Sequence, residues 1–479
     1  MAGRIVMVAE FVESGPRCLF EEEMMPSTYS RRTLLAALPG AGLTAVLGTA
    51  AVAGPAAARP AVTGAAGAVR AALTRAARPL RTTELGGDLS DLRPLGVAIG
   101  GASVVGLGEV VHGAHELFAL KHRAFRYLVR EKGFTTFALE TSWTAGLRLN
   151  DHVLHGIGNP RAIMAEEFGV AWPWNVHEIL DLIRWMRAHN LRHPTRPVQF
   201  MGTDMAHPRI PTSLFERVTG YAARQHPALE PQLTALYREL HVHATTAAFM
   251  ALPQPDRRRI AENVREAHRL LAAQPSGPDR TAFDWAVQHA RVLAQTATLL
   301  SYDLADPQQI PQAMRYRDEL MADNTAWWNR HTDHKILLSA HNGHTAYQTY
   351  DPEHYPVIQG TYLRQLLGAD YMSIGTTFGH GASTVPEGEN AEWTVHRFDP
   401  PRRGSSEHTL DQIPHRAYLI DLRTAPPPAR EWLHQDRPTR DIGPPGDPYR
   451  PYTLAHGHDV LVHLHNLRPA TPLSTGAPS

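Results

Sequence analysis

Residues 106–116 read GLGEVVHGAHE, and this stretch continues an apolar run that begins at Ser103. The run has the length and composition of a short buried strand, and it brings Glu109 and His112 to its far end. A helical pattern of apolar residues begins immediately afterwards, at Ala114. A carboxylate and an imidazole at the turn from a strand into a helix are usual components of an active site in an α/β protein.

Three further apolar runs also end in an ionisable residue, and the pairs of run and residue are 134–139 with Glu140, 198–202 with Asp204, and 336–340 with His341. Residues 371–377 and 417–422 are two more candidate strands. Short apolar runs separated by helical patterns predict a parallel sheet covered on both faces. We therefore expect a three-layer α/β/α core with a mostly parallel sheet.

The α/β core is predicted in two parts, residues 83–210 and 331–424. Between them, residues 211–330 show a helical pattern that is broken only by prolines, so we expect an all-helical insertion. Residues 425–479 are rich in proline, arginine and histidine. This composition predicts an irregular C-terminal tail whose last residues, roughly ten, are disordered.

The N-terminal segment, residues 1–58, is predicted to lie outside the fold. The paired arginines at Arg31 precede a weakly hydrophobic Ala/Gly-rich stretch, and residues 56–58 form an A-x-A cleavage site. This pattern is typical of a twin-arginine signal peptide, preceded here by an upstream extension to about Met24. We expect a secreted protein with no stable membrane insertion after cleavage, and an Ala-rich linker over residues 59–82.

Cysteine content and net charge exclude several classes of function. Cys18 is the only cysteine and lies in the predicted extension. The exported chain would then have no thiol for a disulfide, a cysteine nucleophile or a Cys-ligated zinc. Lys and Arg together number 47, and so do Asp and Glu. This balance favours neither nucleic acid nor an anionic membrane surface as a partner.

The carboxyl ends of the predicted strands should share one rim of the sheet, which is where ligands bind in parallel α/β folds. The ionisable residues expected on that rim are Glu109, His112, Glu140, Asp204, His341 and His344. Any one of them alone is more often a helix cap or a solvated group. Four strands that end alike indicate a shared site, because buried carboxylates and imidazoles need partners.

These residue types suit hydrolysis by activated water. An imidazole can take a proton from water, and an adjacent carboxylate can fix its tautomer. A second histidine or a cation can stabilise the oxyanion that forms when water attacks an ester carbonyl. Lys121, about two turns into the helix after His112, is a candidate cation, with an exposed helix lysine as the alternative. No G-x-S-x-G motif is present, which argues against an acyl-enzyme on serine.

Two tryptophans near the rim are candidates for an open cleft that accepts a large apolar substrate. Trp143 and Trp174 lie just after or between rim residues, and Trp172 and Phe378 are further candidates. The alternative for each ring is ordinary core packing. The expected substrate contacts are Lys121, Asp204, Trp143 and Trp174.

A metal centre is an alternative interpretation of the same residues. His341 and His344 have a spacing compatible with two metal ligands, which Glu140 or His112 could complete. No H-E-x-x-H pattern accompanies them, so we expect neither a metal nor another cofactor. A second alternative is a secreted binding protein for a large ligand such as haem or a macrolide, with the rim histidines as ligands or gates.

Five motifs resemble those of the erythromycin esterase family. They are GLGEVVHG at 106–113 followed by ELF at 116–118, FALE at 137–140, GTD at 202–204, RDxxMAxN at 317–324, and AHNGH at 340–344. The agreement runs in order from about Ser103 to Gly379. The resemblance implies a three-layer α/β core with a helical insertion and an activity linked to antibiotic resistance: hydrolysis of a macrolide lactone without a required metal.

The resemblance also implies roles for the residues of the rim. His112 resembles the general base that activates water, and Glu140 resembles the carboxylate that supports catalysis. His341 and His344 resemble the paired histidines of the site, and Glu109 resembles an acid that orients its neighbours. We therefore expect a carboxylic ester hydrolase that opens a macrolide lactone or a related small-molecule ester by attack of His-activated water, without a covalent intermediate.

Two positions depart from the pattern of the family. Lys121 stands where some members carry an arginine, and lysine lacks the planar, bidentate fork of a guanidinium group. Gln359-Gly360 stands where many members have Met-Gly.

Overall fold

The structure is a computed structural model that describes residues 59–473 apart from 169–172, 388–391 and 444–446. The predicted extension and signal peptide, residues 1–58, and the end of the predicted disordered tail, residues 474–479, lie outside the described residues. Among the helices that are described, none is both long enough and apolar enough to cross a membrane.

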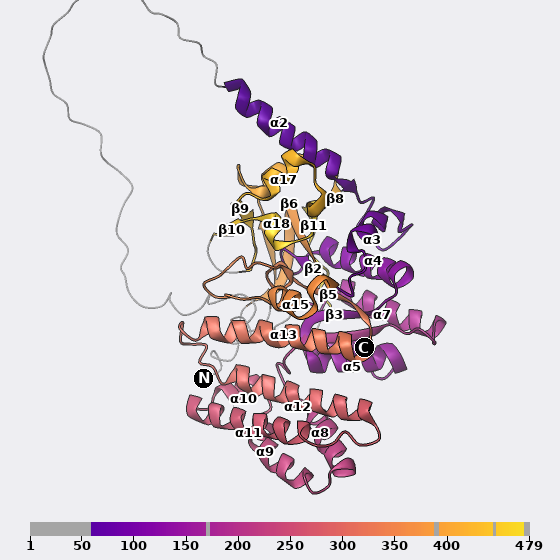
Figure 1. Cartoon of the computed structure of the whole chain (residues 1–479), viewed down its shortest axis with the longest axis vertical. Helices are drawn as coiled ribbons and strands as arrows, with labels where there is room; N and C mark the ends of the chain where they lie inside the picture. The colour runs from indigo at the N-terminus through magenta and orange to yellow at the C-terminus, as the bar shows by residue number, and fades with distance from the viewer. Residues whose placement is uncertain (1–58, 169–172, 388–391, 444–446, 474–479) are drawn as a thin grey trace, which may run out of the picture.

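A nine-stranded sheet forms the centre of the described part of the chain (Figure 1). Its order is β1-β8-β11-β6-β2-β5-β3-β4, with β7 paired to β6 outside this path, and β9 pairs with β10 separately. The bounds are β1 (Arg78–Pro79), β2 (Val104–Glu109), β3 (Phe134–Ser142), β4 (Gln199–Asp204), β5 (Lys335–His341), β6 (Tyr371–Glu387), β7 (Glu392–Phe398), β8 (Ala417–Asp421), β9 (Arg437–Arg440), β10 (Tyr449–Tyr452) and β11 (Val460–Leu467).

The predicted mostly parallel sheet is confirmed. Of the described strands, the six from β11 to β4 along the sheet are parallel, whereas β1, β7 and β8 are antiparallel to their partners. β2 lies between β5 and β6, and Glu109 is in register with His341. Two of the predicted rim residues therefore end neighbouring strands at the middle of the sheet.

Helices cover both faces of the sheet, which confirms the three-layer core. The described α-helices are α2 (Arg59–Ala76), α3 (Arg93–Ile99), α4 (His115–Lys132), α5 (Trp143–His155), α6 (Pro160–Phe168), α7 (His177–Arg192), α8 (Thr212–Gln225), α9 (Glu230–Val242), α10 (Thr246–Met250), α11 (Gln254–Ala272), α12 (Arg280–Leu300), α13 (Ile310–Thr332), α14 (Asn342–Thr345), α15 (Gln359–Leu367), α16 (Ser406–Leu410), α17 (Pro427–Leu433) and α18 (Leu454–Gly457).

Alternation along β2 shows how the layers form. Val105 and Leu107 belong to the apolar core that α3, α4, α5 and α7 complete on one face. Val104 belongs to the core that α13 and α15 complete on the other. Because successive side chains of a strand point to opposite faces, a continuous apolar run fills both layers.

Helices α8 to α12 follow β4 and pack on one another at one end of the molecule (Figure 1). Their shared core includes Phe215, Tyr237 and Val264. α13 comes next in the chain and packs on the sheet beside β4, so it joins this helical group to the layer that covers the sheet. Residues 211–330, predicted as a helical insertion, contain α8 to α12 and most of α13.

The prediction of a linker over residues 59–82 is wrong. Most of this segment is α2, whose Ala72 and Leu73 are fully buried in a core shared with α17 and β8. Alanine is the strongest helix former, and in a helix Val69, Leu73 and Ala76 share one face. An Ala-rich composition therefore marked an apolar helix face here and not a flexible tether.

The prediction of an irregular tail over residues 425–479 is also wrong for most of its described length. The segment contains α17, β9, β10, α18 and β11, and β11 lies inside the sheet between β6 and β8. Val460, Val462 and Leu464 of β11 point into the same core as β2. Histidines at the alternate positions, such as His463, hid this strand because they lower its apparent apolar character.

Candidate active site

Glu109 and His112 form a hydrogen-bonded pair at the carboxyl end of β2. His112 Nδ1 lies 2.5 Å from Glu109 Oε1. Glu109 is fully buried, whereas 14% of the His112 side chain is exposed. The chain turns at Gly113, whose φ is +71° and where a Cβ would lie 1.7 Å from the carbonyl oxygen of Thr384. Only glycine accommodates that turn, which lies between His112 and the start of α4.

Lys121 holds the other oxygen of the same carboxylate. Its Nζ lies 2.5 Å from Glu109 Oε2 and also donates to the carbonyl of Ala340 at 3.2 Å. Burial lowers the pKa of Lys121, against the opposing charge of Glu109. For Glu109, burial acts to raise the pKa, but Lys121 and His112 lower it overall. Lys121 was expected to contact substrate, but in the structure it is buried and faces Glu109.

His341 faces His112 from the end of β5, with the two ring centroids 5.1 Å apart. The Gly343 N–H donates to His341 Nδ1 at 3.0 Å, so the ring proton lies on Nε2. Nε2 in turn donates to the carbonyl of Ile442 at 3.0 Å. Burial, reinforced by the charge of His112, lowers the pKa of His341 to about 3. His341 is therefore a neutral imidazole with one defined tautomer.

Glu140, near the end of β3, contacts both His341 at the end of β5 and His344 on α14. Its Oε2 accepts the backbone N–H of His341 at 2.9 Å, and its Oε1 lies 3.1 Å from His344 Nε2. Oε1 is also 3.4 Å from Arg317 Nη2. Burial by itself raises the pKa of Glu140, but His344, Arg317 and His112 together hold it well below its ordinary value. Glu140 is thus an ionised carboxylate, and both of its oxygens accept contacts from the protein.

His344 lies between two carboxylates. Its Nδ1 is 2.7 Å from Asp318 Oδ1, and its Nε2 contacts Glu140. Burial lowers the pKa of His344, but Asp318 and Glu140 outweigh that effect and raise it to about 10. At neutral pH His344 is an imidazolium that donates to both carboxylates. Asp318 Oδ1 also accepts the backbone N–H of Gln359 at 2.7 Å.

Arg317 closes this buried network from the side of α13. Its Nε donates to Asp204 Oδ2 at 2.9 Å, and its Nη2 lies 2.7 Å from the same oxygen. Asp204 and Arg317 are both buried. Asp204 was predicted as a substrate contact, but in the structure its carboxylate is engaged by Arg317 inside the protein.

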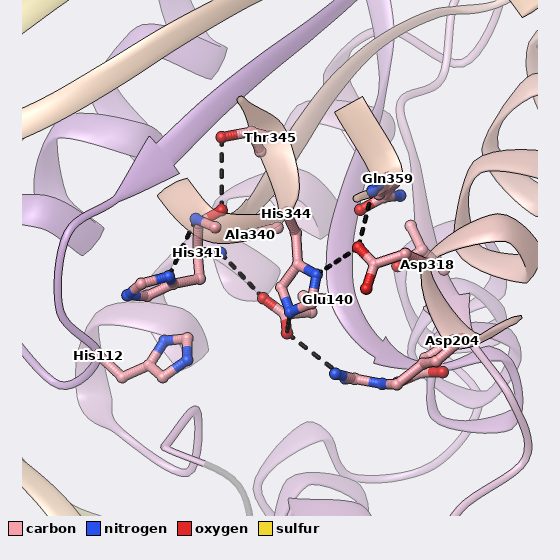
Figure 2. Close-up of polar contacts among 12 residues, drawn as sticks. His112, Glu140, Asp204, Asp318, Ala340, His341, His344, Thr345 and Gln359 are labelled. Atoms are coloured by element: carbon pink, nitrogen blue, oxygen red, sulfur yellow. Dashed lines mark hydrogen bonds and ion pairs between the residues drawn. The ribbon is translucent and has the colours of Figure 1, made fainter. Parts of the chain in front are cut away.

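Figure 2 shows how these side chains divide into two parts. His112 and His341 lie together, and a series of side-chain contacts that runs from Glu140 through His344 to Asp318 extends away from them. In the first part, the partly exposed imidazole of His112 is paired with Glu109 and faces the neutral imidazole of His341, which suits proton transfer and oxyanion stabilisation. The second part is a closed set of ion pairs that fixes the backbone of His341 through Glu140.

The aromatic residues expected near the rim have different positions. Trp174 meets the expectation of proximity: its ring lies edge-on to that of His112, with the centroids 5.7 Å apart. Trp143 is instead buried in a core of aromatic rings with Trp285 and Trp328, because the first turn of α5 directs it towards α12 and α13. Phe378 is likewise fully buried, and Trp172 lies outside the described residues.

Sequence reasoning did not assign four groups that complete the site. Arg317 and Asp318 were visible as part of a motif on a predicted helix, but nothing local indicated that Arg317 reaches β3 and β4 or that Asp318 reaches His344. Gln359 donates its backbone N–H to Asp318, and a backbone contact cannot be predicted from the side-chain type. The carbonyl of Ile442, the partner of His341, belongs to the segment predicted as tail.

The geometry gives no support to a metal centre on the pair His341 and His344. His341 and His344 each use both ring nitrogens in hydrogen bonds or ion pairs within the protein. A set of side chains with ligand atoms close enough to share a metal ion does occur in the described part of the chain, but it consists of His380, Asp411 and His465.

The sequence matches the family model for erythromycin esterase over residues 129–467. This match contains Glu140, His341 and His344 and begins after His112. An erythromycin esterase type II of Escherichia coli is 26% identical over an alignment of 359 residues, which covers 69% of this chain and 83% of that protein.

Three solved structures have the same fold. A protein described as a succinoglycan biosynthesis protein aligns with a TM-score of 0.75 and 28% identity, covering 85% of this chain and 98% of that one. A Bacillus cereus protein aligns with a TM-score of 0.78 and 28% identity, covering 85% and 99%. A mutant of the erythromycin esterase EreC in its open conformation aligns with a TM-score of 0.65 and 18% identity, covering 83% and 99%.

Proposed function

The chain belongs to the erythromycin esterase family, and from this premise we propose that it is a hydrolase that opens a macrolide lactone or a related ester. The reaction we propose is direct attack of an activated water on the ester carbonyl, without a covalent intermediate. The observation that carries the proposal is the Glu109–His112 pair facing His341 at the carboxyl end of β2.

His112 is the general base of the proposed reaction. Glu109 accepts the Nδ1–H, so the lone pair of the neutral imidazole is on Nε2, the atom that would take a proton from water. Lys121 keeps Glu109 ionised, and the ionised carboxylate stabilises the imidazolium that forms. This buried lysine supplies the charge at short range although it lacks the fork of an arginine.

His341 is the proposed oxyanion donor. Its Nε2–H donates to the Ile442 carbonyl in the structure, and in the proposal the substrate oxygen takes the place of that carbonyl. Water adds to the carbonyl carbon while His112 takes its proton. The intermediate then collapses, the ring C–O bond breaks, and His112 returns the proton to the leaving alkoxide. The products are a carboxylic acid and a hydroxyl group on one opened chain.

Glu140 and His344 are positioning residues in this proposal. Glu140 holds the backbone N–H of His341 and is itself held by His344 and Arg317. These contacts fix the backbone at His341. A donor held in a fixed position stabilises developing charge better than one that must be reoriented.

The decisive experiment incubates the purified protein with a panel of macrolides and with simple esters. We expect at least one compound to gain the mass of one water, and His112→Asn to lose this activity while keeping the fold. A panel in which no compound is hydrolysed would contradict the proposed function. If the wild type binds a macrolide without hydrolysing it, and His112→Asn binds it with the same affinity, the protein is instead a binding protein.

A single-turnover reaction in ¹⁸O-labelled water tests whether an enzyme carboxylate acts as a covalent nucleophile. Direct attack of water places ¹⁸O in the new carboxylate in the first turnover. Attack by a carboxylate such as Glu109 would form an anhydride, and its hydrolysis at the enzyme carbonyl would leave unlabelled enzyme oxygen in the first product. We expect labelled product from enzyme in excess over substrate.

We also propose that the protein is exported by the twin-arginine route, on the basis of the sequence that begins at Arg31. Fusing residues 1–58 to a folded reporter tests this directly. Export of the reporter should depend on the arginine pair and fail when both arginines are replaced by lysine.

A further inference from the structure

A second cluster of histidines and a carboxylate lies outside the candidate active site, where β6 and β11 pass the end of α16. Its members are His380 on β6, Asp411 directly after α16, and His465 on β11. One ligand atom of each side chain lies within 4.8 Å of the others. We propose that these three residues bind a divalent transition-metal ion of the zinc class, independently of the proposed hydrolase function.

A fourth residue, His463, holds the carboxylate of this cluster. The Thr377 hydroxyl lies 3.0 Å from His463 Nδ1, and His463 Nε2 lies 3.2 Å from Asp411 Oδ1. The hydroxyl donates to Nδ1, so Nε2–H donates to Asp411. Metal-binding carboxylates and imidazoles are usually oriented by such hydrogen-bond partners. His463 is almost fully buried, so this support belongs to the folded core.

The backbone of β6 leaves room for Asp411 at this position. A Cβ on Gly379 would lie 2.2 Å from Asp411 Oδ1 and 2.5 Å from the carbonyl oxygen of His465. No larger residue fits there without moving one of them. The close approach of Asp411 to the two strands therefore depends on the glycine next to His380.

His380 and His465 can reach a common ion. The rings of His380 and His465 lie at 90° with centroids 5.0 Å apart, and His465 Nδ1 already contacts Asp411 at 2.6 Å. Ligand atoms in a tetrahedral zinc site lie about 3.3 Å apart. Because 46% of the His465 side chain is exposed, its rotation can close the set, and water can complete the coordination.

The donor set selects the class of ion. Two imidazoles and one carboxylate suit Zn²⁺, Ni²⁺ or Co²⁺, whereas Mg²⁺ and Ca²⁺ prefer sites built from oxygen alone. The ligands come from two parallel strands and the turn after α16. A bound ion would therefore tie the end of β11 to β6 and add stability in proportion to its occupancy.

The test measures Zn²⁺ binding to the full, untagged chain by titration calorimetry, with Mg²⁺ as the comparison ion. We expect tight binding of one Zn²⁺ and none of Mg²⁺ at the same concentration. Asp411→Asn and His465→Ala should each weaken Zn²⁺ binding by roughly tenfold or more, and His463→Ala should weaken it roughly tenfold. The matched control is His189→Ala with His193→Ala, which removes a stacked histidine pair at the C-terminal end of α7.

Asp411→Asn separates loss of metal from loss of fold. Its amide oxygen can still accept from His463, so the unfolding midpoint measured in EDTA should stay close to that of the wild type. Zn²⁺ should raise the midpoint of the wild type and of the α7 control but not of Asp411→Asn. Equal Zn²⁺ affinity in the wild type and Asp411→Asn, or an equal loss in the α7 control, would overturn the proposal.

Discussion

Two groups in the candidate active site each combine a carboxylate, an imidazole and a cation, but the groups differ in burial and in the number of contacts that each charge makes. In the Glu109–His112–Lys121 group, an imidazole that is partly exposed rests on a carboxylate with one buried cation. In the Glu140–His344–Arg317 group, every charged side chain is buried and makes ion pairs or hydrogen bonds with more than one partner. A proton-transfer group needs access and a pKa that can change, whereas a support needs neither. The comparison predicts that the first group controls turnover and the second controls stability.

The largest expected effect is the loss of turnover in His112→Asn. General-base catalysis contributes about 10²- to 10⁴-fold, so kcat/KM should fall within that range, and the unfolding free energy should change little. The neighbouring His115→Asn is the control, because His115 pairs with Glu178 and lies outside the proposed machinery. If kcat/KM falls equally in both variants, the distinction between these histidines is wrong.

Arg317→Met should have the largest effect on stability. It leaves the Asp204 and Glu140 carboxylates without their shared cation, and removal of one partner of a buried pair costs about 3–5 kcal/mol. Arg315→Met on the same helix is exposed and should change the unfolding free energy by less than about 0.5 kcal/mol. Urea unfolding of the three proteins measures the difference, and similar midpoints for both variants would contradict this role for the buried group.

The raised pKa of His344 predicts a stability that falls at alkaline pH. Because the folded pKa is about 10 and the ordinary value is 6.5, the contribution of the charged imidazole is complete below about pH 6.5. It is lost as pH rises towards 10. The unfolding free energy of the wild type should therefore decline between pH 7 and 10 more steeply than that of His344→Gln. Parallel curves for the two proteins would show that His344 carries no extra proton.

The smallest effect on turnover is expected for Trp143→Phe. The ring is buried among aromatic side chains of α12 and α13, so the change should cost about 1 kcal/mol of unfolding free energy and leave kcat/KM unchanged. A tenfold fall in kcat/KM with an intact fold would instead place Trp143 in contact with substrate, as the sequence alone suggested.

The success of the sequence-based prediction follows the range of the interactions involved. Strand ends such as Glu109 and His341 were found because local apolar runs fix where strands stop and parallel pairing then brings their ends together. The partners of Glu140 were not found completely, because Arg317 reaches it across 177 positions of the chain. The inward turn of Lys121 and the carbonyl of Ile442 also depend on packing between distant segments. Composition led to wrong predictions for α2 and β11, because the small residues of α2 and the histidines of β11 belong to regular, packed elements.

The position of β11 has a consequence for the order in which the molecule can assemble. During synthesis β2 leaves the ribosome tens of seconds before β11 at ordinary translation rates. Until β11 arrives, β6 lacks its neighbour on the side away from β2, and the Ala114 backbone lacks its bridge to Pro469. A nascent chain of this protein therefore carries an open sheet edge beside the turn that holds His112, a hazard for edge-to-edge aggregation that chaperones would have to shield.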